Sequence, residues 1–216
     1  MSTYIAERRV EEKERRRTEI LEAAERLYAE KGWDAVTMDQ VARGARLSRA
    51  LLYVYFRDRE ELLFAISERA MAVLKARFEG AVASQSAGMD QVEAIGRAYM
   101  AYAQELPHYF DACARFHAHT QSATPGSNEG ACALAGDQTI AIVVGAIVTG
   151  LEDGSIRKDI GDPLLLAVSL WAFTHGMIQL AMTKTSDLGR MGVLIPDFGD
   201  YAFGLLRAMC EPPSGL

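Results

Sequence analysis

Residues 37–56, with the sequence TMDQVARGARLSRALLYVYF, constrain the fold more than any other stretch of this chain. Thr37 and Gln40 have the spacing of a capping box, which predicts that a helix begins at Met38. Ser48 provides a second N-cap, so a second helix is expected directly after it. Two helices this short cannot bury their apolar sides alone, and they require a further helix behind them.

The flanking sequence supplies further helices on both sides of this stretch. Apolar residues recur at helical spacing between residues 20 and 28, and Gly32 is expected to end that helix as a C-cap. Asp58 and Glu61 repeat the capping pattern at the start of an apolar stripe that extends to about residue 80. These elements predict a three-helix helix-turn-helix, whose second short helix would enter the major groove of DNA.

The rest of the sequence predicts helices only, since no segment alternates polar and apolar residues with the period of a strand. We therefore predict an all-α fold, in which an N-terminal three-helix helix-turn-helix DNA-binding domain precedes a C-terminal helical domain. The predicted parts are a flexible or loosely helical arm at residues 1–14, the helix-turn-helix domain at 15–60, and the C-terminal domain at 61–216.

The net charge of −6 is unevenly distributed along the chain. Residues 1–70 contain fourteen Lys and Arg against fourteen Asp and Glu, whereas residues 71–216 contain nine against fifteen. A neutral N-terminal part on an acidic body is compatible with a small DNA-contacting domain, although a basic one would support DNA binding more strongly. Affinity for DNA should then depend on a few placed contacts and on dimerisation.

Composition argues against several other classes of protein. No stretch contains eighteen consecutive apolar residues, and the N-terminus lacks the apolar segment of a signal peptide, so we expect a cytoplasmic protein without membrane contact. Cys113, Cys132 and Cys210 are far apart and have no metal-ligand spacing. The sequence contains no triad spacing, phosphate loop, metal motif or cofactor motif, and we expect neither an enzyme nor a bound cofactor or metal.

The second short helix is expected to present one face to DNA. Leu52 and Phe56 are four residues apart and should point into the three-helix core. An arginine in the first turn can form a bidentate pair with guanine, and small apolar side chains can contact thymine methyl groups. The residues left on or near the exposed side are Arg49, Ala50, Leu51, Tyr53, Val54 and Tyr55.

At these positions the chain resembles the TetR family of transcriptional regulators. The resemblance is close over residues 18–63 and looser beyond, where residues 154–157 and Asp162-Pro163 resemble the hairpin before the dimerising helices of many members. The residues that match the family pattern are Gly32, Trp33, Val36, Thr37, Val41, Ala42, Ala45, Leu47, Ser48, Leu52, Tyr53, Tyr55, Phe56, Arg59 and Leu62.

The resemblance implies roles for several of these side chains. Thr37, Tyr53, Tyr55 and Arg59 would hold phosphates, which positions the recognition helix without reading sequence. Packing in the core is an alternative for either tyrosine, but not for both, because Tyr53 and Tyr55 project to different sides. The full predicted DNA-contacting set is Thr37, Arg46, Ser48, Arg49, Ala50, Leu51, Tyr53, Val54, Tyr55 and Arg59.

One position departs from the family pattern. Most members have glycine in the turn between the two short helices, whereas this chain has Arg46 there and Gly44 two residues earlier. We expect Arg46 to adopt a positive φ at modest cost, and its side chain could also reach a phosphate. Upstream, Arg15, Arg16 and Arg17 either form ion pairs along their own helix or approach the DNA backbone, and the sequence does not decide between these alternatives.

The resemblance implies that residues 61–216 form a helical ligand-binding and dimerisation domain, with an effector site and a dimer interface. Aromatic and polarisable residues suit an apolar pocket between helices, and the candidates are Tyr102, Phe110, Phe116, His117, Trp171, His175 and Met177. His117 and His119 are two apart and would diverge on a helix, so a metal site there is not expected. A helix following Asp162 has two apolar faces, which suggests that a second subunit covers one of them. The candidate dimerisation residues are Leu166, Leu170, Phe173, Phe198, Ala202 and Leu205.

The family resemblance implies a homodimeric repressor. Two recognition helices would bind a palindromic double-stranded DNA operator, and a small, largely apolar effector in the C-terminal domain would release it. Two alternatives remain open on the sequence: an architectural or interaction module that binds DNA without an effector, and a TetR-like activator.

Overall fold

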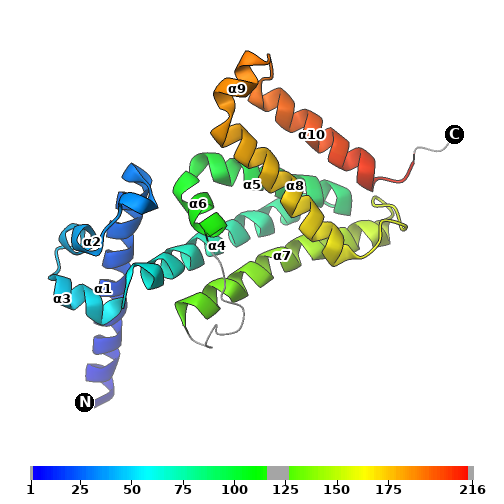
Figure 1. Cartoon of the computed structure of the whole chain (residues 1–216). Helices are drawn as coiled ribbons and strands as arrows, with labels where there is room; N and C mark the ends of the chain where they lie inside the picture. Colours follow the sequence, from blue (N-terminus) through cyan, green and yellow to red (C-terminus); the bar gives the residue numbers. More distant parts are fainter. Residues whose placement is uncertain (1, 116–126, 214–216) are drawn as a thin grey trace. The chain divides into compact units, whose positions relative to one another are not determined.

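The structure, a computed structural model, describes residues 2–115 and 127–213, with side chains from residue 7 onward (Figure 1). Its regular elements in these ranges are all helical, which confirms the predicted all-α class. They are α1 (Ser2–Lys31), the 3-10 helix η1 (Trp33–Ala35), α2 (Met38–Gly44), α3 (Arg49–Tyr55), α4 (Arg59–Ala83), α5 (Gly88–Glu105), α6 (Pro107–Arg115), α7 (Asn128–Asp153), α8 (Pro163–Thr183), α9 (Thr185–Arg190) and α10 (Ile195–Cys210).

The chain divides into two compact units. The first consists of residues 1–71 and 106–134, and the second of residues 72–105 and 135–216. The long helices α4 and α7 therefore contribute to both units, and α6 belongs to the first. The predicted boundary between the DNA-binding and C-terminal domains, at residue 60, instead places α6 in the C-terminal domain. That boundary remains a prediction about function.

The predicted helix boundaries around the turn are confirmed. Thr37 Oγ1 accepts from the Gln40 N–H, and the Gln40 amide accepts from the Thr37 N–H, which completes the capping box of α2. Ser48 caps α3 through its hydroxyl. α1 ends at Gly32, which has φ 77° and donates its N–H to Tyr28 O at 2.9 Å.

The start of α4 varies the expected capping pattern. Asp58 Oδ1 accepts from the Glu61 N–H at 2.8 Å, as the spacing predicts. The Glu61 carboxylate reaches back one residue further than in a capping box and accepts from the Arg57 N–H at 2.6 Å. Both carboxylates therefore satisfy backbone donors at the helix start.

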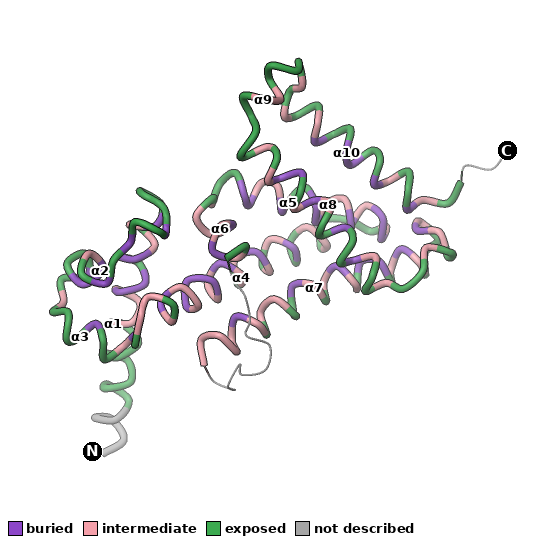
Figure 2. Tube along the Cα trace, in the orientation of Figure 1, coloured by how far each residue is buried: buried purple, intermediate pink, exposed green. Residues whose placement is uncertain are grey.

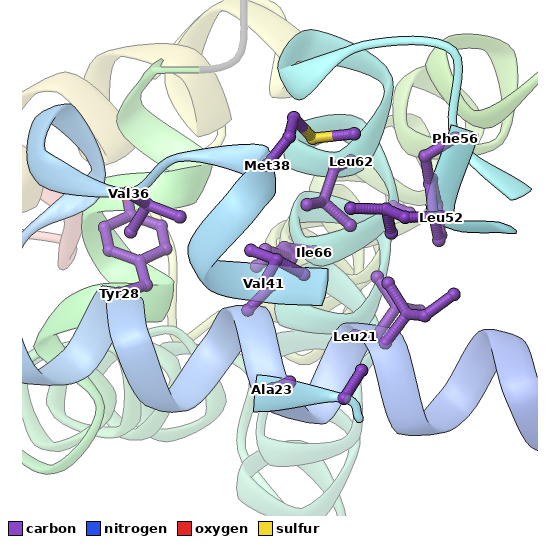
Figure 3. Close-up of a cluster of buried hydrophobic side chains, with 14 of the residues drawn as sticks. Leu21, Ala23, Tyr28, Val36, Met38, Val41, Leu52, Phe56, Leu62 and Ile66 are labelled. Carbon is purple, nitrogen blue, oxygen red and sulfur yellow. The ribbon is translucent and has the colours of Figure 1, made fainter. Parts of the chain in front are cut away.

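Five helices, α1, α2, α3, α4 and α6, enclose the buried core of the first unit together with η1 (Figure 3). Leu52 and Phe56 are fully buried in it, so the predicted inward side of α3 is confirmed. α6 closes the cluster through Ala112, whose carbonyl accepts a hydrogen bond from Ser67 of α4 at 3.1 Å.

Small residues allow the helices of the second unit to approach closely. A Cβ at Gly88 would lie 2.0 Å from the backbone nitrogen of Gly150, so α5 begins against the backbone of α7. A Cβ at Gly96 would lie 2.6 Å from the ring of Phe203, so α10 packs closely against α5 at this glycine. Arg207 of α10 adds ion pairs with the carboxylates of Asp90, Glu93 and Glu211.

One face of α8 packs inside the second unit, and another remains exposed (Figure 2). Ala167, Leu170, Thr174, Met177 and Ile178 form the buried face. Both α7 and α8 are long and apolar enough to cross a membrane by length and composition alone, a test that core helices of soluble proteins also pass. The exposed apolar residues of α8 are Leu164, Leu165, Val168, Trp171, Leu180 and Met182.

Candidate nucleic-acid interface

The turn between α2 and α3 is a Schellman motif with an arginine in the left-handed position. Arg46 has φ 56°, as the departure from the family pattern predicts. The Leu47 N–H donates to Ala42 O at 2.8 Å, and the Arg46 N–H donates to Arg43 O at 3.1 Å, the two bonds that define this helix ending. The nearby glycine, Gly44, has a different role. It lies so close to α1 that a Cβ at this position would be 3.3 Å from Ala23 Cβ.

The turn directs one face of α3 into solvent. Val54 is 75% exposed, and Leu51 and Tyr53 are about half as exposed as Val54, at 38% and 40%. Arg49 and Ala50 in the first turn are exposed as well. A contiguous group of exposed apolar side chains is more informative than a single one, and beside an arginine it fits a surface that contacts base edges and thymine methyl groups.

Tyr53 and Tyr55 have different surroundings. Tyr53 belongs to the exposed face, whereas Tyr55 is half-buried and packs against the core of the first unit. The core alternative therefore fits Tyr55 better than Tyr53. Its hydroxyl remains a candidate phosphate contact, because a half-buried tyrosine can keep its polar tip in water.

The two capping hydroxyls also have capacity for a phosphate. Thr37 Oγ1 and Ser48 Oγ each accept a backbone N–H, at 3.4 Å and 3.2 Å, in order to cap their helices. A hydroxyl that accepts in this way still has its own O–H to donate. Both residues are exposed at helix N-termini, where the helix dipole and remaining N–H groups favour an anion.

Arg49 is held in place by neighbours on both short helices. Its Nε lies 3.2 Å from Asp39 Oδ1, and Nη1 donates to Asp39 Oδ2 at 3.4 Å. The guanidinium carbon is 5.6 Å from the centre of the Tyr53 ring, and Nη2 lies 3.5 Å from the Tyr53 hydroxyl. The hydrogen bond to Tyr53, followed by the charge of Asp39, raises the pKa of Arg49 above its ordinary value.

Arg59 has a structural contact in addition to its predicted role. Its guanidinium lies over the Trp33 ring, 5.3 Å from the ring centre. Nη1 donates to Val36 O at 3.2 Å and to Asp34 O at 3.4 Å, so Arg59 ties the start of α4 to the segment before α2. Any phosphate contact of Arg59 would use its remaining N–H groups.

The N-terminal arginines divide between two roles. Arg15 and Arg16 form ion pairs with Glu12 and Glu19 on their own helix, which matches the solvated-face interpretation. Arg17 instead lies over the Phe56 ring at 5.5 Å and donates to Asn128 Oδ1 at 2.9 Å. The arm predicted to be flexible or loosely helical is part of α1, which begins at Ser2.

An aromatic cluster occupies the second unit around the predicted effector residues. The Tyr99 hydroxyl and His175 Nδ1 share a hydrogen bond of 2.9 Å, and the two rings are 6.2 Å apart. Tyr99 also contacts the rings of Phe78 and the fully buried Tyr102. Burial lowers the pKa of His175, so the imidazole is neutral at pH 7.

The remaining effector candidates are more scattered. Met177 is buried in the second unit, whereas Trp171 is 55% exposed, and its ring lies edge to face with that of His175, with ring centres 6.4 Å apart. Phe110 is buried in the first unit. Phe116 and His117 lie outside the described residues. Tyr99 was missing from the predicted set, although its position three residues before Tyr102 places both on one side of α5.

The predicted dimerisation residues are partly internal. Leu170 and Ala202 are 7% and 4% exposed within the chain, which leaves them little surface for a partner. Leu166, Phe173 and Phe198 are half-buried, and Leu205 is 46% exposed. A cavity of about 450 Å³ lies between α8 and α10, and its lining includes Leu166, Leu170, Phe173 and Met209.

Two family models match most of the chain. The model of bacterial regulatory proteins of the tetR family matches residues 20–66, which contain the helix-turn-helix, and the model of the tetracyclin repressor-like C-terminal domain matches residues 92–191. Among curated proteins, the HTH-type transcriptional regulator HbdR of Aromatoleum sp. (strain CIB) is 31% identical over 110 residues. That match covers 50% of this chain and 46% of HbdR, so the chain spans about half the length of this relative.

Solved structures resemble the chain over nearly its whole length. A protein of unknown function from Rhodococcus sp. RHA1 has a TM-score of 0.76 and 25% identity, covering 91% of this chain and 96% of its own. The transcriptional regulator FadR from Bacillus subtilis, in complex with stearoyl-CoA, has a TM-score of 0.65 and 14% identity, with 89% and 98% covered. At that identity, the likeness to FadR shows the fold alone.

Proposed function

This chain belongs to the TetR family of transcriptional regulators, and we propose that it is a homodimeric repressor that binds a palindromic DNA operator and is released by a small apolar effector. The observation that carries the proposal is the exposed face of α3, which is held by two capped helix starts and a closed turn. A rigid helix with arginine, tyrosine and apolar side chains outward suits the major groove. Such a repressor would act in the cytoplasm, where bacterial DNA lies.

We expect three groups of contacts with DNA: with guanine, with thymine methyl groups and with phosphates. Arg49 would pair with guanine, and Ala50, Leu51 and Val54 would contact thymine methyl groups. The hydroxyls of Thr37, Ser48, Tyr53 and Tyr55, with the cations of Arg46 and Arg59, would hold phosphates. A first unit with so little net charge makes these contacts more important, because no broad positive field attracts the DNA.

Dimerisation would cover the exposed apolar surface of α8 and α10. Leu165 and Trp171 on α8 and Tyr201 on α10 are 69%, 55% and 71% exposed in the single chain. Exposed apolar area of this kind is typical of a protein interface, and isologous pairing of the same surface is the usual arrangement in a dimer. The proposed interface therefore consists of residues that remain exposed in the single chain, and it no longer includes the buried Leu170 and Ala202.

The effector would bind next to the aromatic cluster of the second unit. Tyr99 and His175 offer polar atoms in otherwise apolar surroundings, with Tyr102 and Met177 buried nearby on the same two helices. This is the composition expected of a small-molecule site. FadR was solved with stearoyl-CoA, and an acyl chain, unlike the charged CoA part, would suit these apolar surroundings, so acyl-CoAs are the first effectors to test.

Release from DNA requires the effector to favour one state of the first unit. α6 is bound to that unit by the Tyr28 hydroxyl, which donates to Asp111 at 2.7 Å, and by Arg115, which donates to both carboxylate oxygens of Asp34. α4 is shared between the units. A ligand that moves either helix could change operator affinity, with a coupling free energy of roughly 1–3 kcal/mol.

Selection of bound duplexes from a random-sequence library tests the core of the proposal. We expect the full chain to recover a palindrome with half-sites about one helical turn apart, bound by a dimer. Recovery of no common sequence would contradict operator binding. Titration of the recovered duplex with stearoyl-CoA, shorter acyl-CoAs and free CoA then tests effector control, and unchanged DNA affinity throughout would favour the effector-independent alternative.

Reporter expression in cells distinguishes repression from activation. A promoter that carries the recovered palindrome should be silenced by the chain and released by an effector that weakens DNA binding. Increased expression in the presence of the chain would instead support a TetR-like activator.

A further inference from the structure

Asp39 is an acidic side chain on a surface that should bind an acidic polymer. It lies in the first turn of α2 and is 51% exposed, while its partner Arg49, in the first turn of α3, is 63% exposed. Their contact joins the two short helices across the turn, with Nε to Oδ1 at 3.2 Å and Nη1 to Oδ2 at 3.4 Å. Tyr53 contacts the same guanidinium from within α3.

The hydrogen bonds at this site leave Arg49 suitable donors for a base. A guanidinium has five N–H groups, and the bonds to Asp39 and Tyr53 use one on each terminal nitrogen. Each terminal nitrogen carries a second N–H, so Arg49 keeps a donor on both for O6 and N7 of a guanine. The carboxylate and the aromatic ring thus limit the directions in which these donors can point.

We infer that Asp39 is a specificity-determining residue, which orients Arg49 for guanine, while its negative charge weakens binding to every duplex. This inference rests on the proposed operator binding. An oriented arginine loses less freedom when it binds, so the correct base pair gains affinity. The negative charge of Asp39 near the phosphates lowers affinity for any duplex, regardless of its sequence. The orientation of Arg49 increases the ratio of specific to non-specific binding, whereas the charge lowers both affinities alike and leaves that ratio unchanged.

Stability offers a weaker explanation for Asp39. A carboxylate in the first turn of a helix interacts favourably with the helix dipole, but exposed charges and exposed ion pairs contribute little to folding. The capping box of Thr37 and Gln40 already satisfies the start of α2. A purely structural Asp39 would therefore leave sequence preference unchanged when it is replaced.

The test uses the full chain and DNA selected by the unmodified protein from a random-sequence library. Four variants are compared: Asp39→Asn, Arg49→Ala, the double variant, and Glu60→Gln, which removes one negative charge from the first turn of α4 as a matched control. Each is titrated against the selected duplex, against duplexes with every single base-pair change, and against a scrambled duplex over a range of salt concentrations.

We expect Asp39→Asn to reduce the preference for one guanine in each half-site by about tenfold, in the same position that Arg49→Ala affects. Affinity for the scrambled duplex should rise, and the double variant should lose no more guanine preference than Arg49→Ala alone. Glu60→Gln should keep the full preference.

Two results overturn the inference. Equal gains of Asp39→Asn on selected and scrambled duplexes would mean that Asp39 acts through its charge alone. Additive losses in the double variant would mean that Asp39 acts independently of Arg49. Failure of the unmodified protein to select any sequence would instead contradict operator binding itself, and is recognised before any variant is made.

Discussion

The first unit completes its apolar core within one chain, whereas the second leaves large apolar side chains in water. Around α2 and α3, the inward residues Leu52 and Phe56 are fully buried and the exposed ones form a single face. On α8, both long sides are apolar, and Trp171 is 55% exposed although Leu170 beside it is 7% exposed. Under the proposed function, the exposed apolar residues of the two units have different roles: those of α3 would contact DNA, and those of α8 would be covered by a second subunit.

Truncation of the first core should have the largest effect. Leu52→Ala removes a fully buried side chain and should lower the free energy of unfolding by about 2–5 kcal/mol, because a cavity remains. Val54→Ala, at a position 75% exposed on the same helix, should change it by less than about 0.5 kcal/mol. Urea denaturation of both variants measures the contrast, and similar losses would mean that α3 has no distinct inward face.

A charge on the outward face of α8 should be the next largest effect. Trp171→Glu would place an unpaired carboxylate in the proposed interface and should weaken dimerisation by at least about 2 kcal/mol, or roughly thirtyfold. Gln85→Glu adds the same charge at an exposed position of the same unit and serves as the control. Sedimentation analysis gives the dissociation constants, and an undisturbed Trp171→Glu dimer would place the interface elsewhere.

Relief of the turn should have a smaller, stabilising effect. Arg46→Gly removes the cost of a left-handed arginine, roughly 1–2 kcal/mol, but glycine also loses about 0.5–1 kcal/mol more on folding. We expect a net gain of at most about 1.5 kcal/mol in the free energy of unfolding, measured by thermal denaturation. Arg46→Ala keeps the strained φ and should show no such gain, and equal stabilities of the two variants would argue against strain at this turn.

Replacement of His175 should have the smallest effect, a change in how the stability of the second unit depends on pH. Burial lowers the pKa of His175 in the folded chain below its ordinary value of 6.5. The unfolded chain therefore binds more protons near that pH, so stability is retained above about pH 6.5 and is lost as the pH falls towards the folded pKa. His175→Gln should flatten this decline relative to the unmodified protein.

His108 on α6 provides the comparison between the units. Its pKa is also lowered by burial, opposed by the charge of Glu25, so His108→Gln should flatten the acid dependence of the first unit instead. Urea denaturation between pH 5 and 8, followed in each variant, separates the two contributions. Identical profiles for His175→Gln and the unmodified protein would show that His175 does not titrate differently on folding.

Local features of the fold could be predicted because their signals lie a few residues apart. The capping box at Thr37, the N-cap at Ser48 and the C-cap at Gly32 each depend on neighbours within four residues, and all three are confirmed. The positive φ of Arg46 was also expected, from the glycine that the family has there. Helix ends leave backbone N–H and C=O groups without partners inside the helix, and neighbouring residues supply the missing hydrogen bonds.

Distant pairings could not be predicted in the same way. Asp39 is ten residues from Arg49, and Tyr99 is seventy-six from His175, so no spacing rule connects either pair. The division of α8 into an inward and an outward face was equally hidden, since the sequence offers apolar residues on both sides. Those contacts depend on how separate helices cross, which periodicity does not specify.

The sequence by itself determined the helices, their capped ends, the helix-turn-helix and the inward side of α3. Only the tertiary structure showed that Arg49 forms an ion pair with Asp39 and that Arg59 donates a hydrogen bond from α4 to Val36 O before α2. It also showed that Trp171 is exposed. The physical reason is the range of the interactions. Helix formation is controlled by residues within one or two turns, whereas the partner of an exposed side chain depends on which distant surface packing brings beside it.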